Sequence, residues 1–146
     1  VALREVESWS RILVGGLFVW SASAHLANPY YFLSSVYQYE LTNASVGVIV
    51  ASGLPFLELL LAACLLSGAC VPAAWVISCG LLLLFAGVQT SALMRNLQIS
   101  CGCFGAEASQ PISAMTTAWT GMLAIVAGAG AAISRERSGT PSPKTK

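Results

Sequence analysis

Two cysteines separated by a single glycine are the residues of this chain best suited to chemistry. Cys101, Gly102 and Cys103 follow one another between two apolar runs. In an extended or turned segment, Cα atoms two residues apart come within about 4.4–6.8 Å, the separation that a disulfide needs, and glycine relaxes the backbone between them. A disulfide across one residue is strained and exchanges readily, while its small ring adds little stability. The spacing therefore favours a redox pair.

Two other roles for this pair remain open. It could form an inert disulfide, or it could bind a metal together with His25 and Glu107, a set that reaches four ligands only if both contribute. The other three cysteines, Cys64, Cys70 and Cys79, fall in or beside apolar runs. Thiols in such places usually pack as small hydrophobic groups. We expect packing roles for these three and reactivity only at the pair.

Glu58 and His25 are the other candidates for chemistry. Glu58 lies near the middle of an apolar run, where an ionised carboxylate costs several kcal/mol. It is either a neutral side chain hydrogen-bonded to a serine or a backbone carbonyl of a neighbouring helix, or an intramembrane proton acceptor for quinone or thiol chemistry. His25 is either a base that generates a cysteine thiolate, or an interfacial histidine beside Tyr30 and Tyr31.

The composition indicates the environment in which these residues lie. Of 146 residues, 56% are hydrophobic and 9% are charged, whereas an ordinary soluble domain carries about 25% charged residues. Such a chain cannot cover itself with a water-compatible surface, so its solvent must be the lipid bilayer. The net charge of +1, without a basic cluster, excludes a nucleic-acid partner. Between residues 12 and 134, the charged side chains are those of Glu40, Glu58, Arg95 and Glu107.

Four apolar runs predict the fold class, an all-α polytopic membrane protein with a four-transmembrane-helix bundle. About 20 helical residues cross a hydrocarbon core of about 30 Å. We expect a transmembrane domain over residues 1–134 and a disordered cytoplasmic tail over 135–146. If the small residues 21–24 formed a signal-peptide cleavage site, three spans would remain. The runs cover residues 12–26, 46–66, 73–93 and 112–133.

The segments between and within the spans carry further predictions. The aromatic-rich segment 27–45 should form a short amphipathic helix on the membrane surface. In the last run, Ala124, Gly128 and Ala132 recur every four residues. Small residues at this spacing let another helix approach closely. We therefore expect this stripe to be a packing surface without chemistry.

The distribution of lysine and arginine predicts the orientation. With both ends of the chain on one side, that side holds six of the seven basic residues, and the opposite loops hold only Arg95. The positive-inside rule then places both termini in the cytoplasm and the cysteine pair outside it. We expect a multi-pass protein of a bacterial inner membrane, whose outer face is a compartment where disulfides form.

Three short motifs resemble one known family. Cys101-Gly102-Cys103-Phe104-Gly105, Leu54-Pro55-Phe56-Leu57-Glu58-Leu59 and His25-Leu26-Ala27-Asn28-Pro29-Tyr30 resemble the MauE branch of the DoxX-like membrane proteins, over residues 11–133. The resemblance implies a four-helix membrane protein associated with disulfide formation in methylamine utilisation, alongside a thioredoxin-like partner. It also implies Cys101 and Cys103 as the redox pair and Glu58 as the intramembrane acid. The family more often has lysine where His25 stands.

We therefore expect a membrane redox protein that exchanges disulfides with an extracytoplasmic thioredoxin-like protein, which is the activity of a thiol-disulfide oxidoreductase. Cys101, Cys103, Glu58 and His25 are the predicted catalytic residues. By analogy with other four-helix disulfide-generating membrane enzymes, a membrane quinone near Glu58 could carry the electrons. The alternative is a non-enzymatic assembly or maturation factor in which the pair is a structural clip. A solute transporter is disfavoured, because four short spans show no inverted repeat.

Overall fold

The computed structural model describes residues 2–41, 43–97, 99 and 111–139, with side chains between 5 and 136. Within these residues the chain is helical, which confirms the all-α prediction. The helices are α1 (Ala2–Ala27), α2 (Pro29–Gln38), α3 (Ala44–Ser67), α4 (Val71–Met94) and α5 (Ala114–Gly139).

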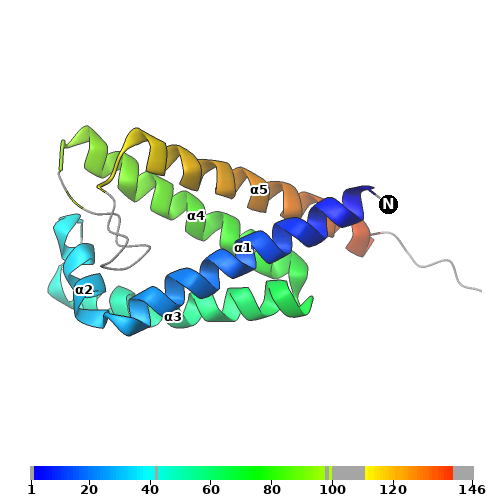
Figure 1. The fold of residues 1–146 in the computed structure, drawn as a ribbon, viewed down its shortest axis with the longest axis horizontal. Coiled ribbons are helices and arrows are strands. Elements are labelled where there is room, and N and C mark those ends of the chain that lie inside the picture. Colours follow the sequence, from blue (N-terminus) through cyan, green and yellow to red (C-terminus); the bar gives the residue numbers. More distant parts are fainter. Residues whose placement is uncertain (1, 42, 98, 100–110, 140–146) are drawn as a thin grey trace, which may run out of the picture.

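The four long helices form an antiparallel bundle (Figure 1). The closest packing is within two pairs, α1 with α3 and α4 with α5, while α3 also contacts α4 and α1 contacts α5. In the described residues α1 and α4 make no such contact, so they lie across the bundle from each other. The short helix α2 packs on α3 and α1 at the end of the bundle opposite the N-terminus.

Local signals in the sequence explain where these helices begin and end. The Asn43 side chain accepts a hydrogen bond of 3.0 Å from the backbone N–H of Val46 and so caps the start of α3. Gly68 ends α3 in the left-handed conformation, at φ 80°. Arg11 of α1 donates its Nε–H to the Leu65 carbonyl at 2.8 Å. The guanidinium thereby satisfies one of the carbonyls that the end of α3 leaves without a partner in its own helix.

Three helices have the length and composition to cross a membrane, Ala44–Ser67, Val71–Met94 and Ala114–Glu136. They coincide with three of the four predicted runs. Among the described helices, α1 is as long as α5 but falls outside this set, because its serines, Arg11 and His25 lower its hydropathy. The structure also confirms a helix within the segment 27–45, the helix α2.

The end of α5 differs from the expected domain boundary. The helix continues to Gly139, so residues 135–139 are helical, whereas a disordered tail was predicted from residue 135. Arginine and glutamate have high helix propensity, so the charged residues here extend the helix although they end the apolar run. Residues 140–146 lie outside the described residues.

The contact between α4 and α5 follows the helical repeat and departs from the predicted stripe. Ala124 is buried, Gly128 faces Cys79, but Ala132 is exposed. The buried line passes through Gly130, whose backbone lies against the indole ring of Trp75. A repeat of four residues drifts around a helix that has 3.6 residues per turn, so the prediction is correct for the first two positions and wrong for the third.

The three cysteines outside the Cys-Gly-Cys motif are free thiols. Cys79 is half-buried and its Sγ lies 3.5 Å from the Ala124 carbonyl oxygen, which fits the predicted packing role. Cys64 is half-buried as well. Cys70 is exposed in the turn before α4, because that turn ends the apolar segment, so it is not the packing residue that we expected.

Candidate functional site

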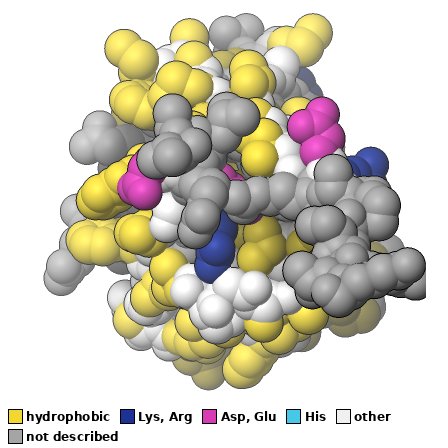
Figure 2. Space-filling model, turned by 90° about the vertical axis from the view of Figure 1, so that its right-hand side faces the viewer, with side chains coloured by type: hydrophobic (Ala, Val, Ile, Leu, Met, Phe, Trp, Pro, Cys, Tyr) yellow, Lys and Arg dark blue, Asp and Glu magenta, His cyan; other side chains and the backbone are white. Residues whose placement is uncertain are grey.

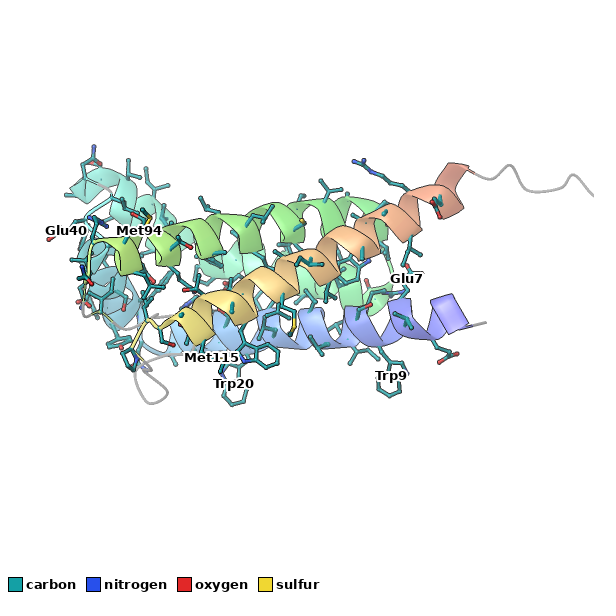
Figure 3. The ribbon with its side chains drawn as sticks, turned by 90° about the horizontal axis from the view of Figure 1, so that it is seen from above. Glu7, Trp9, Trp20, Glu40, Met94 and Met115 are labelled. Carbon is teal, nitrogen blue, oxygen red and sulfur yellow. The ribbon has the colours of Figure 1, made fainter. Side chains whose placement is uncertain are left out.

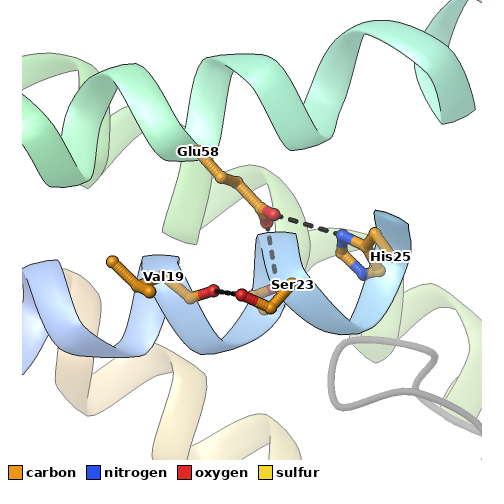
Figure 4. A network of polar contacts seen from close by, with 5 residues as sticks. Val19, Ser23, His25 and Glu58 are labelled. Atoms are coloured by element: carbon orange, nitrogen blue, oxygen red, sulfur yellow. Dashed lines mark hydrogen bonds and ion pairs between the residues drawn. The ribbon is translucent and has the colours of Figure 1, made fainter. Parts of the chain in front are cut away.

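The buried carboxyl group of Glu58 is the centre of a polar site inside the bundle. Glu58 is fully buried in α3, and its carboxylate faces α1 (Figure 4). Ser21 Oγ donates a hydrogen bond of 3.0 Å to Oε1, and His25 Nδ1 lies 3.1 Å from Oε2. Ser21 and His25 are also buried. Each carboxyl oxygen therefore has one partner from the neighbouring helix.

The geometry of α1 brings both partners to Glu58. Ser21 and His25 are four residues apart, so they lie on the same face of the helix, which packs along α3. Ser23 lies on another face and donates its hydroxyl to the Val19 carbonyl of its own helix, at 2.7 Å. The site therefore depends on which face of α1 packs against α3 as much as on the sequence of α1.

A third helix, α2, also contacts the imidazole ring. His25 stacks on Phe32 of α2, with ring centroids 3.7 Å apart and an angle of 17° between the rings. Phe32 is 7% exposed and His25 is 2% exposed. Because Pro29 starts α2 two residues after the end of α1, the chain turns back at once and places Phe32 over the ring. The imidazole is thus fixed by Glu58 and Phe32 together.

This arrangement can hold one mobile proton. A carboxylate with an imidazolium and a carboxylic acid with a neutral imidazole both carry no net charge, and both allow a hydrogen bond between Oε2 and Nδ1. Such a pair can be buried with its polar atoms satisfied. The two side chains are already in contact, so the pair can accept or release a proton without a change in their arrangement.

The structure brings two of the four predicted catalytic residues together. We expected Glu58 to bond to a serine of a neighbouring helix, and Ser21 does so. We did not predict the contact with His25, and the burial of His25 separates it from Tyr30, which is 87% exposed. The spacing of Ser21 and His25 on a helix that precedes a buried acid was the available signal. The proton-acceptor role of Glu58 stays a prediction.

Cys101 and Cys103 lie outside the described residues, as does Glu107. The residues on either side of this segment are described. The backbone N–H of Ile112 donates to the Ile99 carbonyl at 2.9 Å, so the chain returns to the point from which it left.

The end of α4 near this segment is tied to the end of α2. Arg95, directly after α4, donates a hydrogen bond to the Tyr39 carbonyl and lies 3.7 Å from the Glu40 carboxylate. Both contacts lie at one end of the bundle, where Glu40 and Met94 are seen in Figure 3. The connection between α4 and α5 is therefore anchored at the end of the bundle that α2 covers.

A cavity of about 360 Å³ lies beside the Glu58–His25 pair. Gln89, the single amide of α4, lines it and is 2% exposed. Thr120 Oγ1 of α5 donates to Gln89 Oε1 at 3.3 Å. Gln89 is not among the residues predicted from the sequence, although an amide in so apolar a span was a signal. The lining residues are His25, Phe32, Ser35, Val36, Tyr39, Leu41, Val50, Leu54, Leu84, Phe85, Val88 and Gln89.

Within the described residues, no group of three histidine, cysteine or acidic side chains could hold a metal ion.

Comparison with known proteins identifies one family. The family model described as "Methylamine utilisation protein MauE" matches residues 3–134, which include the four long helices except Ala2 of α1 and residues 135–139 of α5. Searches of curated proteins and of solved structures gave no match.

Proposed function

The chain belongs to the methylamine utilisation protein MauE family of membrane proteins, and on that premise we propose that it exchanges disulfides through Cys101 and Cys103. The partner is a thioredoxin-like protein outside the cytoplasm. The proposal includes the wider kinship of this family with DoxX-like proteins, which the three sequence motifs support.

The observation that carries the proposal is the anchoring of the segment that holds the pair. Ile99 and Ile112 are hydrogen-bonded to each other, and Arg95 ties the end of α4 to α2. A chain advances at most about 3.6 Å per residue, so Cys101 is tethered within about 7 Å of Ile99. This supports a thiol pair presented at the α2 end of the bundle, near the level of the last turn of α1, which contains His25.

The reaction needs no group beyond the two proteins. The thiolate of one cysteine attacks a sulfur of the partner's disulfide, the partner's S–S bond breaks, and a mixed disulfide forms as the partner's other sulfur leaves as a thiolate. The second cysteine then displaces the partner. The products are a Cys101–Cys103 disulfide and a reduced partner, and the reverse sequence oxidises the partner.

Trapping variants test this exchange. Replacing Cys103 with alanine removes the resolving thiol, so the mixed disulfide between Cys101 and the partner should accumulate on non-reducing gels. Cys101→Ser with Cys103→Ala should abolish it. Cys70→Ser is the matched control, because Cys70 is an exposed free thiol in a different turn, and it should leave the adduct unchanged.

Absence of any adduct in Cys103→Ala, together with an unchanged redox state of the partner in cells, would contradict the proposal. That result would favour the alternative, an assembly factor in which the pair clips its own loop.

We also propose that α1 is a fourth span. Its 26 residues extend about 39 Å at 1.5 Å per residue, enough to cross a core of about 30 Å. Trp9 and Trp20 project away from the bundle on one side of α1 (Figure 3) and are 67% and 63% exposed. The polar side chains Ser21 and His25 face inward to Glu58. An apolar outer face with an inward polar face suits a helix packed in lipid.

The same bundle supports the expected orientation in a bacterial inner membrane. The N-terminus and the end of α5 lie at one end of the bundle (Figure 1). Seen from that end, basic and acidic side chains stand out among hydrophobic ones (Figure 2). Arg11 and Arg135 belong to this half, and Arg95 to the other. By the positive-inside rule the termini are cytoplasmic and α2 is outside.

Labelling of single cysteines tests the four spans and their direction. In a cysteine-free background, Tyr30→Cys in α2 should react with an impermeant maleimide added to intact spheroplasts. Ala69→Cys, exposed in the turn between α3 and α4, should react only after the membrane is opened. Ser8→Cys, exposed near the start of α1, should label like Ala69→Cys, and labelling of Ser8→Cys from the same side as Tyr30→Cys would overturn the fourth span.

A further inference from the structure

We propose that the cavity beside His25 binds the ring of a membrane quinone, which accepts the electrons of the cysteine pair. The binding site is argued from described residues alone. Its redox role rests on the proposed disulfide exchange, and the experiment below separates the two.

The size and lining of the cavity select a small lipid-soluble ligand. Its volume of about 360 Å³ falls in the range of about 300–1,000 Å³ that small-molecule sites occupy. Apolar and aromatic side chains from α2, α3 and α4 form most of the wall, among them Phe32, Leu54 and Phe85. A charged or sugar-like ligand would lose its hydration without replacement in such a wall. A ligand dissolved in the bilayer would not.

The polar groups of the wall distinguish a quinone from a lipid chain. His25 comes from α1 and Gln89 from α4, helices that do not pack against each other. Each side chain is 2% exposed and has a polar partner within the bundle, Glu58 for His25 and Thr120 for Gln89. A quinone ring carries one carbonyl oxygen at each of two opposite edges, and two polar groups on separate walls match that pattern. An acyl chain offers nothing to either.

Aromatic contacts add to this match. His25 and Phe32, whose rings are stacked on each other, both line the cavity. Planar rings pack favourably against aromatic side chains in offset or edge-to-face arrangements. The isoprenoid tail of a quinone is apolar. Leu84 lines the cavity and is 61% exposed, so the tail can extend into the lipid on that side.

Repeated oxidation of the partner calls for such a ligand, because the exchange itself only moves a disulfide from one protein to the other. Converting the Cys101 and Cys103 dithiol into a disulfide forms one S–S bond and releases two electrons and two protons. A quinone takes up two electrons and two protons and becomes a quinol. Both thiol protons thus end on the two quinol oxygens, and the disulfide that remains can oxidise the thioredoxin-like partner. The Glu58–His25 pair, at the wall of the cavity, relays one of these protons.

The test uses the full chain in detergent micelles, with decylubiquinone as the probe. Val88→Phe adds volume inside the cavity, and we expect decylubiquinone binding, measured by quenching of the protein fluorescence, to weaken by about tenfold or more. Val36→Phe fills the cavity from α2, so the test does not depend on one variant folding. Leu83→Phe is the matched control on α4, because Leu83 is 58% exposed and does not line the cavity; it should bind like the wild type.

Two results would overturn the site. One is unchanged binding in both filled variants, and the other is displacement of decylubiquinone by 1-decanol at equal concentration, which would identify a lipid-chain site. The double variant Cys101→Ser with Cys103→Ala should bind the quinone but form no quinol. If the quinone binds normally and no mixed disulfide can be trapped, the site stands and the disulfide exchange fails. If exchange is intact and no quinone binds, only this inference fails.

Discussion

Replacing Glu58 with alanine is expected to lower the free energy of unfolding by about 3 kcal/mol, the lower end of the range for removing one member of a buried pair. Single hydrogen bonds between membrane helices average only about 0.6 kcal/mol, so the two bonds alone do not account for this loss. The larger part comes from Ser21 and His25, which stay buried with no carboxyl group to meet.

Equilibrium unfolding in mixed micelles, followed by circular dichroism, measures this effect. Glu58→Gln keeps the shape of the side chain and an acceptor for Ser21, so we expect a loss of about 1 kcal/mol. Leu60→Ala is the control in the same helix, because Leu60 is 61% exposed and should change stability by at most about 0.5 kcal/mol.

A double-mutant cycle isolates the contact between Glu58 and His25. If the pair acts as a unit, Glu58→Ala combined with His25→Ala should cost clearly less than the sum of the two single changes. Strict additivity would show that the 3.1 Å contact contributes no coupling, and Glu58 would then be held by its other neighbours.

Replacing Gly130 with valine should destabilise the protein by about 3 kcal/mol, at the upper end of the range for overpacking a core. A Cβ at this position would lie 2.5 Å from Cε2 and 2.7 Å from Cδ2 of Trp75. Trp75 is fully buried, so its ring cannot swing away. Valine adds two methyl groups to that clash, and α4 and α5 must separate to admit them.

Two other glycines of α5 provide graded controls for this unfolding measurement. Gly121→Ala meets nothing within 4 Å and should stabilise the helix by up to about 1 kcal/mol. Gly128→Ala would place its Cβ 3.6 Å from Cys79 Sγ, an ordinary contact, so the change should be small. Trp75→Leu should partly rescue Gly130→Val, and failure to rescue would show that the indole is not the obstacle.

The sequence was sufficient for those parts of the fold that depend on composition alone. Helices α3, α4 and α5 are apolar enough for lipid over their whole length, so they can be recognised without knowing their neighbours. Helix α1 is harder to recognise from composition, because it carries polar residues that face the interior, where Glu58 meets Ser21 and His25. Large apolar side chains such as Trp9 and Trp20 are on its outer face, but an average over the helix mixes the two faces.

The site could be predicted residue by residue but not as an arrangement. Glu58 is conspicuous as an acid in an apolar run, yet it is 33 positions from His25 in the sequence, and only the docking of α1 on α3 brings the two together. The cavity depends on Gln89 and Phe32, which come from two further helices. Cys101 and Cys103 remain a prediction from their spacing and from the family, since they lie outside the described residues.

The short reach of the Glu58–His25 contact makes its proton nearly insensitive to the membrane voltage. Carrying one elementary charge across the whole membrane at 100 mV involves about 2.3 kcal/mol. The two atoms are 3.1 Å apart, about a tenth of a hydrocarbon core of about 30 Å, so a transfer between them involves at most about 0.2 kcal/mol at that voltage. Respiring and de-energised cells should therefore hold this proton in the same place.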